Sequence, residues 1–164
     1  MIPAIHNILF ATDLSENAHY AFEYASVMAD RFGAEITILH VLEELSPSSL
    51  GLVGEIVGKK RWADLKRQNE EKIISSIRSR IENYYKSLNQ TVSKHPSIVQ
   101  SIIVKTGHPV DQIIHQAEKT DCDIVVMGSR GHGILTEAML GSTSHRVLRR
   151  CNKPVLVVRL PGNE

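Results

Sequence analysis

Short apolar runs alternate with amphipathic stretches along this chain. Residues 8–11 (ILFA) and 123–127 (DIVVM) lack the polar alternation of a half-exposed strand, which indicates strands buried on both faces. Between such runs, apolar residues recur every three to four positions, which predicts helices. The pattern predicts strands at 8–11, 35–42, 97–105, 123–127 and 155–160, and helices at 18–32, 62–88, 109–117 and 142–150.

This alternation predicts an α/β fold, a doubly wound, five-stranded parallel sheet with helices on both faces. The length of 164 residues suits one domain, residues 1–164, and the irregular segment 44–61 suits a flap or partner-contact region, or simple disorder. Ligands of such sheets bind beyond the carboxyl ends of the strands, where the winding direction reverses. If the first and fourth strands are neighbours, Asp13 and Gly128 emerge side by side at that crevice.

Charge and cysteine content indicate which partners and which cellular compartment to expect. The net charge of +1 implies no global field for nucleic acid or membrane, and we expect neither as a partner. The amino terminus has no basic region before its apolar run, and no apolar run is long enough to span a bilayer, so we expect a soluble, cytoplasmic protein. Cys122 and Cys151 form no CxxC motif, which favours buried free thiols over a disulfide or a zinc site.

Four of the ten glycines lie within fourteen residues, in the spacing Gly128-x2-Gly131-x9-Gly141-Ser142, with Gly133 between them. This spacing is neither the dinucleotide GxGxxG nor the Walker GxxxxGK[ST] motif. Helix-start N–H groups and three hydroxyls would coincide after Gly141, a combination that suits phosphate. An ordinary strand-to-loop turn followed by a Ser142 helix cap explains the glycine spacing about equally well.

With these residues placed, the chain resembles the universal stress protein family over essentially its full length. The resemblance is carried by ILFATDLSENAHYAFEYA, EITILHVLEE, GHPVDQIIHQAEKTDCDIVVMGSRGHG and LGSTSHRVLRRCNKPVLVV. The glycine spacing also matches the G-x2-G-x9-G-[ST] motif of the ATP-binding branch of the family. The resemblance implies a Rossmann-like sheet of strand order 3-2-1-4-5 with a mononucleotide in the crevice.

The family likeness implies a role for each matching residue. Asp13 would face the ribose or adenine side, Val41 and Met127 would flank the adenine, and Arg130 would add charge near the phosphates. The implied nucleotide-binding residues are Ala11, Thr12, Asp13, Val41, Met127, Gly128, Arg130, Gly131, Gly141, Ser142, Thr143 and Ser144. Asp13 with Glu16 three residues later also fits a simple helix cap.

One position departs from the family pattern. His145 stands where relatives commonly carry an acidic residue, so the charge of the phosphate site and its metal binding are open. ATP with Mg²⁺ (or Mn²⁺) is the implied cofactor, with the metal held mainly by phosphate oxygens and water.

The sequence favours binding over catalysis. It has no P-loop lysine and no acidic pair for two metals, so we expect an ATP-binding regulatory module of the stress response with at most slow hydrolysis. The alternatives are a weak ATPase and a phospho-acceptor switch with Asp13 as acceptor. The apolar edge strand 154–160 predicts a homodimer, in agreement with the family resemblance.

Overall fold

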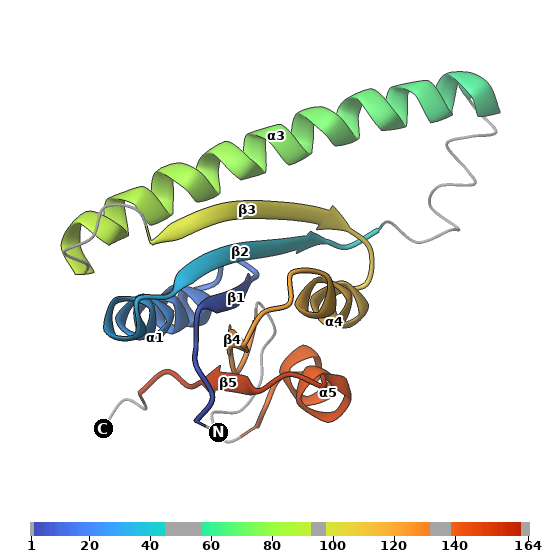
Figure 1. Cartoon of the computed structure of the whole chain (residues 1–164). Coiled ribbons are helices and arrows are strands. Elements are labelled where there is room, and N and C mark those ends of the chain that lie inside the picture. Colours follow the sequence, from blue (N-terminus) through green and yellow to red (C-terminus); the bar gives the residue numbers. More distant parts are fainter. Residues whose placement is uncertain (1, 45–56, 93–97, 132–138, 162–164) are drawn as a thin grey trace.

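A computed structural model describes residues 2–44, 57–92, 98–131 and 139–161 of the chain (Figure 1). Five parallel strands form one sheet: β1 (Asn7–Thr12), β2 (Glu35–Leu42), β3 (Val99–Thr106), β4 (Ile124–Gly128) and β5 (Val155–Val158). Their order is β3-β2-β1-β4-β5, which confirms the predicted doubly wound topology. Phe10 of the central strand pairs with Ile38 on one side and Val126 on the other.

Helices cover both faces of this sheet. On one face, α1 (Glu16–Phe32) and α3 (Lys59–Val92) pack on Phe10 and Ile38 through residues such as Phe22 and Tyr85, all at most 1% exposed. On the other face, α4 (Pro109–Lys119) and α5 (Ser142–Arg150) pack on a second apolar cluster that contains Leu39. Strands buried on both sides explain why their sequences lack polar alternation.

The ends of α1 follow local capping rules. Ser15 is the N-cap, and its hydroxyl accepts a hydrogen bond from Ala18 N at 3.2 Å. The helix stops at Gly33, which takes a left-handed φ of 64°, as the sequence predicts. The interpretation of Asp13 as the cap of this helix is wrong, because Asp13 Oδ1 accepts from Ser15 N at 3.0 Å, before the helix begins.

Several predicted boundaries and buried positions differ from the structure. The helix α3 starts at Lys59, so residues 59–61 are helical rather than irregular, while 45–56 of the predicted flap lie outside the described residues. The strand β5 ends at Val158, two residues early. Phe32, Leu65 and Ile73 follow the apolar spacing but are 55%, 39% and 51% exposed, because they lie off the faces that meet the sheet.

Both cysteines are free thiols, as expected, with Cys122 buried and Cys151 half-buried. In the parts of the chain that the structure describes, no helix combines the length and apolarity needed to cross a membrane.

Candidate functional site

The candidate site lies where β1 and β4 end side by side. Ala11 pairs with Met127 in this register, and the next residues, Thr12 and Gly128, are the last of their strands, so β1 and β4 end at the same level. The backbone of Gly131 then passes so close to the Asp13 carboxylate that a Cβ atom at Gly131 would overlap Oδ2. The predicted meeting of the first-strand end with the glycine segment is therefore present.

A cavity of about 420 Å³ opens at this meeting point. Such a volume is within the usual range for a small-molecule site. All of the predicted nucleotide-binding residues line it: Ala11, Thr12, Asp13, Val41, Met127, Gly128, Arg130, Gly131, Gly141, Ser142, Thr143 and Ser144. Residues from opposite ends of the chain thus contribute to one concave surface.

Seven further residues line the cavity that the sequence did not indicate: Ala18, Leu39, His40, Glu43, Pro109, Ile113 and Ser129. Leu39 and Ile113 join Val41 and Met127 to make one wall apolar. Their apolar spacing marked them as core residues, and only the topology shows that the same cluster also reaches the crevice. The opposite wall is polar, so the cavity suits a ligand with one flat apolar part and one anionic part.

The polar wall is built around the start of α5. Gly141, not Ser142, is the N-cap of this helix, and no side chain caps it, which corrects the predicted capping role of Ser142. Gly141 N donates to Ser129 O at 2.7 Å, and the buried Ser144 hydroxyl lies 2.8 Å from the same oxygen and 3.0 Å from Gly141 O. These bonds fix the helix start, and the first-turn N–H groups have no partner within the helix.

On the β1 side, Thr12 is held from three directions. Its hydroxyl accepts from Leu14 N at 3.1 Å and shares a second bond of 3.1 Å with the Tyr85 hydroxyl, while His40 Nδ1 lies 2.8 Å from its carbonyl oxygen. Leu14 has φ of 64°, a left-handed conformation that is unusual for leucine. The hydroxyl of Thr12 therefore stabilises the turn that presents Asp13 to the cavity.

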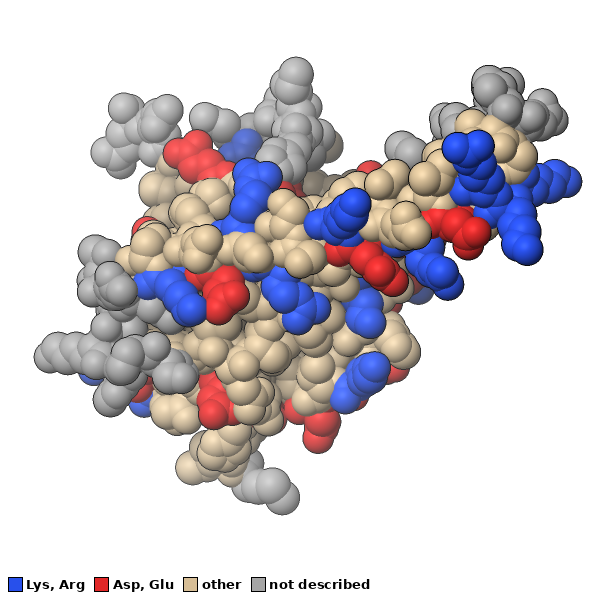
Figure 2. Space-filling model, turned by 90° about the horizontal axis from the view of Figure 1, so that it is seen from above, with Lys and Arg blue, Asp and Glu red and all other residues tan. Residues whose placement is uncertain are grey.

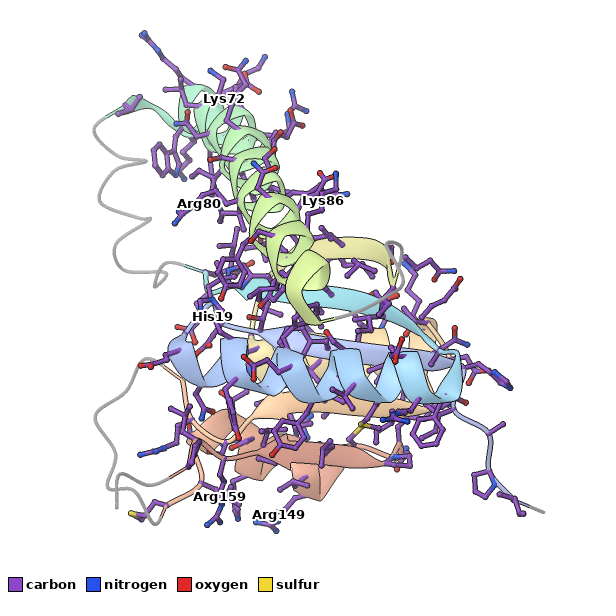
Figure 3. The ribbon with its side chains drawn as sticks, turned by 90° about the vertical axis from the view of Figure 1, so that its left-hand side faces the viewer. His19, Lys72, Arg80, Lys86, Arg149 and Arg159 are labelled. Atoms are coloured by element: carbon purple, nitrogen blue, oxygen red, sulfur yellow. The ribbon has the colours of Figure 1, made fainter. Side chains whose placement is uncertain are left out.

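Tyr85 connects this turn to α3. Its side chain is 1% exposed, and burial raises the pKa of its phenol, so the hydroxyl stays protonated. The neighbouring Tyr84 stacks on His19 of α1 with ring centroids 4.2 Å apart, and burial lowers the pKa of His19 despite the nearby Asp13. In Figure 3, His19 lies where α1 begins, close to α3.

Asn17 is a structural residue of the site that sequence analysis missed. Its side chain is 5% exposed, and Oδ1 accepts from Arg130 N at 3.0 Å, which ties α1 to the glycine segment. A Cβ atom at Gly128 would overlap this same oxygen, so the close approach requires glycine. The second amide atom of Asn17, Nδ2, has no hydrogen-bond partner among the described residues. A single asparagine at a helix start carries no sequence signal for such a role.

The charged groups of the site are few. Arg130 and His40 are its basic lining residues in the described part of the chain, and Asp13 and Glu43 its carboxylates. Those described ranges hold no cluster of three or more residues that could bind a metal ion. His145 is exposed and does not line the cavity, while its backbone N–H makes a 3.0 Å helical bond to Gly141 O.

Comparison with known proteins gives consistent matches over the full length. A model of the Universal stress protein family matches residues 4–159. Universal stress protein MJ0577 of Methanocaldococcus jannaschii is 31% identical over 156 residues, 93% of each chain. Universal stress protein G of Salmonella typhimurium is 33% identical over 154 residues, 92% of this chain and 93% of its own.

Solved structures agree in fold. The structure of MJ0577 superposes with a TM-score of 0.72 at 30% identity, covering 98% of this chain and all of the other. A universal stress protein from Archaeoglobus fulgidus, described in complex with dAMP, has a TM-score of 0.54 at 19% identity, covering 96% and 100% of the two chains. At that identity the second match shows a shared fold.

Proposed function

This chain belongs to the universal stress protein family, and from that premise we propose that its cavity binds an adenine nucleotide, ATP with Mg²⁺, and that the bound nucleotide regulates the protein. The single observation that carries the proposal is the cavity between β1, β4 and the start of α5. A relative is described in complex with dAMP, which supports an adenine nucleotide as the ligand class.

The apolar wall fits the base. Val41 and Met127 lie on the same side of the sheet as Leu39, and Ile113 of α4 packs in the same cluster, so a planar heterocycle can replace water against apolar side chains. Asp13 lies between this wall and the glycine segment, at the place where a ribose would sit. A carboxylate there accepts hydrogen bonds from sugar hydroxyls and repels phosphate, which would favour one orientation of the nucleotide.

The glycine segment and the start of α5 fit the polyphosphate. Ser142, Thr143 and Ser144 line the cavity in the first turn of α5, where N–H groups and the positive end of the helix dipole favour anions. Arg130 adds a cation on the same wall. Mg²⁺ would neutralise phosphate oxygens and complete its coordination with water, since the described cavity offers no carboxylate cluster.

We propose regulation rather than turnover as the consequence of binding. A phosphoryl-transfer site needs charge clamps and a group that positions the nucleophile. The described lining residues include no lysine, and Asp13 and Glu43 are their two carboxylates. No observation favours a weak ATPase or a phosphorylated Asp13 over simple binding.

We also propose that two chains associate through the segment 154–160. The strand β5 is the last strand of the sheet, so one of its two edges has no strand neighbour within the described chain. Such an edge is available to pair with the same edge of a second copy.

Titration calorimetry with ATP and Mg²⁺ tests the nucleotide proposal. We expect saturable binding by the wild-type protein, and at least tenfold weaker binding by Gly131→Val, because the new side chain would meet the Asp13 carboxylate and fill part of the cavity. Ser79→Val, which adds a side chain of similar size at an exposed position on α3, is the matched control and should bind normally. Absence of heat at millimolar ATP, or equal affinity of Gly131→Val, would overturn the proposal.

A further inference from the structure

The helix α3 has a charge that the near-neutral total conceals. It carries nine Lys and Arg residues against four Asp and Glu, a net charge of +5, while the whole chain carries +1 and the remainder therefore −4. Its first turns also project past the carboxyl ends of β2 and β3 in Figure 1. The expectation of no nucleic-acid partner was based on the total charge alone, and this local excess changes that argument.

The charges of α3 are separated by face. At 3.6 residues per turn, about half of the circumference holds six of the nine cations and none of the carboxylates. These six residues, the basic face of α3, are Lys59, Arg61, Lys66, Lys72, Arg80 and Lys86, and all are exposed. The other three cations share the remaining surface with all four carboxylates.

Figure 2 looks down on α3 and shows Lys and Arg side chains along the helix and gathered at its projecting end. Figure 3 shows Lys72, Arg80 and Lys86 extending outward from it. Lys86 pairs with Glu82 at 2.8 Å, and the other five cations form no ion pair with a described residue. From Lys59 to Lys86 the basic face spans about 40 Å, at 1.5 Å rise per residue.

We propose that the basic face of α3 binds the phosphate backbone of a nucleic acid duplex. Between its cations the face carries Ser, Asn and Gln residues, whose side chains can hydrogen-bond phosphate oxygens: Gln68, Asn69, Ser76, Ser79 and Asn83. A duplex offers one negative charge about every 1.7 Å along its axis, so a rod of about 40 Å can contact several phosphates without reading the sequence.

The composition of the face argues against other anionic partners. A membrane-surface helix needs its own apolar face, and the apolar face of α3, with Ile77, Ile81 and Tyr85, already packs on the sheet. A protein interface needs a cluster of aromatic or aliphatic anchors at its centre, and the middle of this face offers Ile73 alone, with Leu65 about two turns away. Single-stranded nucleic acid needs several stacking aromatic residues, and this face offers Trp62, in line with Arg80, while Tyr84 is already stacked on His19.

Fluorescence anisotropy of a labelled 25-base-pair duplex of arbitrary sequence tests the proposal on the full chain. If four phosphates are contacted, the affinity should fall about 100-fold between 50 and 200 mM salt. Charge reversal in Lys72→Glu/Arg80→Glu should weaken binding at least tenfold at 50 mM salt. The matched control Arg31→Glu/Arg149→Glu changes the net charge equally at exposed positions on α1 and α5 and should bind within threefold of wild type.

Four outcomes would overturn the proposal. The first is absence of duplex binding at 50 mM salt, and the second is equal weakening by both double variants. The third is tighter binding to phosphatidylserine vesicles or polyglutamate than to the duplex. The fourth is displacement of the duplex by excess AMP in a parallel titration, which would place the duplex in the crevice instead of on α3. Circular dichroism of each variant confirms that it is folded.

Discussion

Replacement of Gly128 by alanine tests how α1 and the glycine segment are joined. The new Cβ would lie 3.1 Å from Asn17 Cγ and 3.2 Å from the Asn17 backbone carbon, and nearer still to Oδ1, whereas ordinary contact begins at 3.4 Å. The side chain can rotate away from the methyl group, but the backbone cannot. Overpacking of this kind costs typically 1–3 kcal/mol, so we expect Gly128→Ala to lower the free energy of unfolding by about 2 kcal/mol.

A double-mutant cycle with Asn17→Ala isolates the contact. Asn17→Ala alone removes the acceptor of Arg130 N–H, which costs about 1–2 kcal/mol. In the double variant the methyl group at residue 128 enters space that the asparagine side chain has left. We therefore expect a loss smaller than the sum of the two single losses by about 1 kcal/mol.

Urea denaturation followed by circular dichroism measures all four proteins of this cycle. Gly33→Ala provides the control, because Gly33 has a left-handed φ with open space around it at the opposite end of α1. It should cost about 1 kcal/mol through backbone strain and show no coupling to Asn17→Ala. Losses at residues 17 and 128 that add within about 0.5 kcal/mol would refute the packing argument.

Three further predictions concern other parts of the molecule. Burial raises the pKa of Cys122 to about 11, so at pH 8 Ellman's reagent should label Cys151 alone in the folded protein; simultaneous labelling would contradict this. Two backbone N–H groups lower the pKa of Asp123, so the ionised carboxylate stabilises the fold fully above about pH 4, and this stabilisation is lost as the pH falls through the lowered value; the difference in unfolding free energy from Asp123→Asn should therefore be largest at pH 6 and shrink as the pH is lowered below 4. Light scattering should give the mass of two chains for the wild-type protein and the mass of one chain for Val157→Lys, a variant in the segment 154–160. A single-chain mass for the wild type would exclude the dimer.

The sheet could be predicted because its signals are local and strong. Strands buried on both faces appear as uninterrupted apolar runs, and the Gly33 stop and Pro109 at the first position of α4 follow from backbone geometry alone. The meeting of Asp13 with the glycine segment then followed from the topology, because neighbouring parallel strands end at one rim.

The remaining features depend on contacts between distant segments. Asn17 touches Gly128 and Arg130 across more than a hundred residues, and nothing near it in the sequence indicates this. The N-cap of α5 is Gly141 instead of Ser142 because the Ser129 carbonyl accepts a hydrogen bond from Gly141 N and fixes this residue ahead of the helix. The exposure of Ile73 follows from its place off the face of α3 that brings Ile74 and Ile77 against the core.

The first turns of α3, which project past the sheet, should be less stable than the rest of the helix. Before Glu70, which accepts from Thr106 at 2.7 Å, every residue of the helix except Trp62 is exposed, so about three turns rely on helix propensity alone. Lys59, Lys60 and Arg61 also place like charge against the positive pole of the helix. These turns should therefore fray, with amide protection rising steadily toward Ile81. An anion bound at this end would offset the repulsion between these cations and the helix dipole. Anion binding and ordering of the first turns would therefore be coupled.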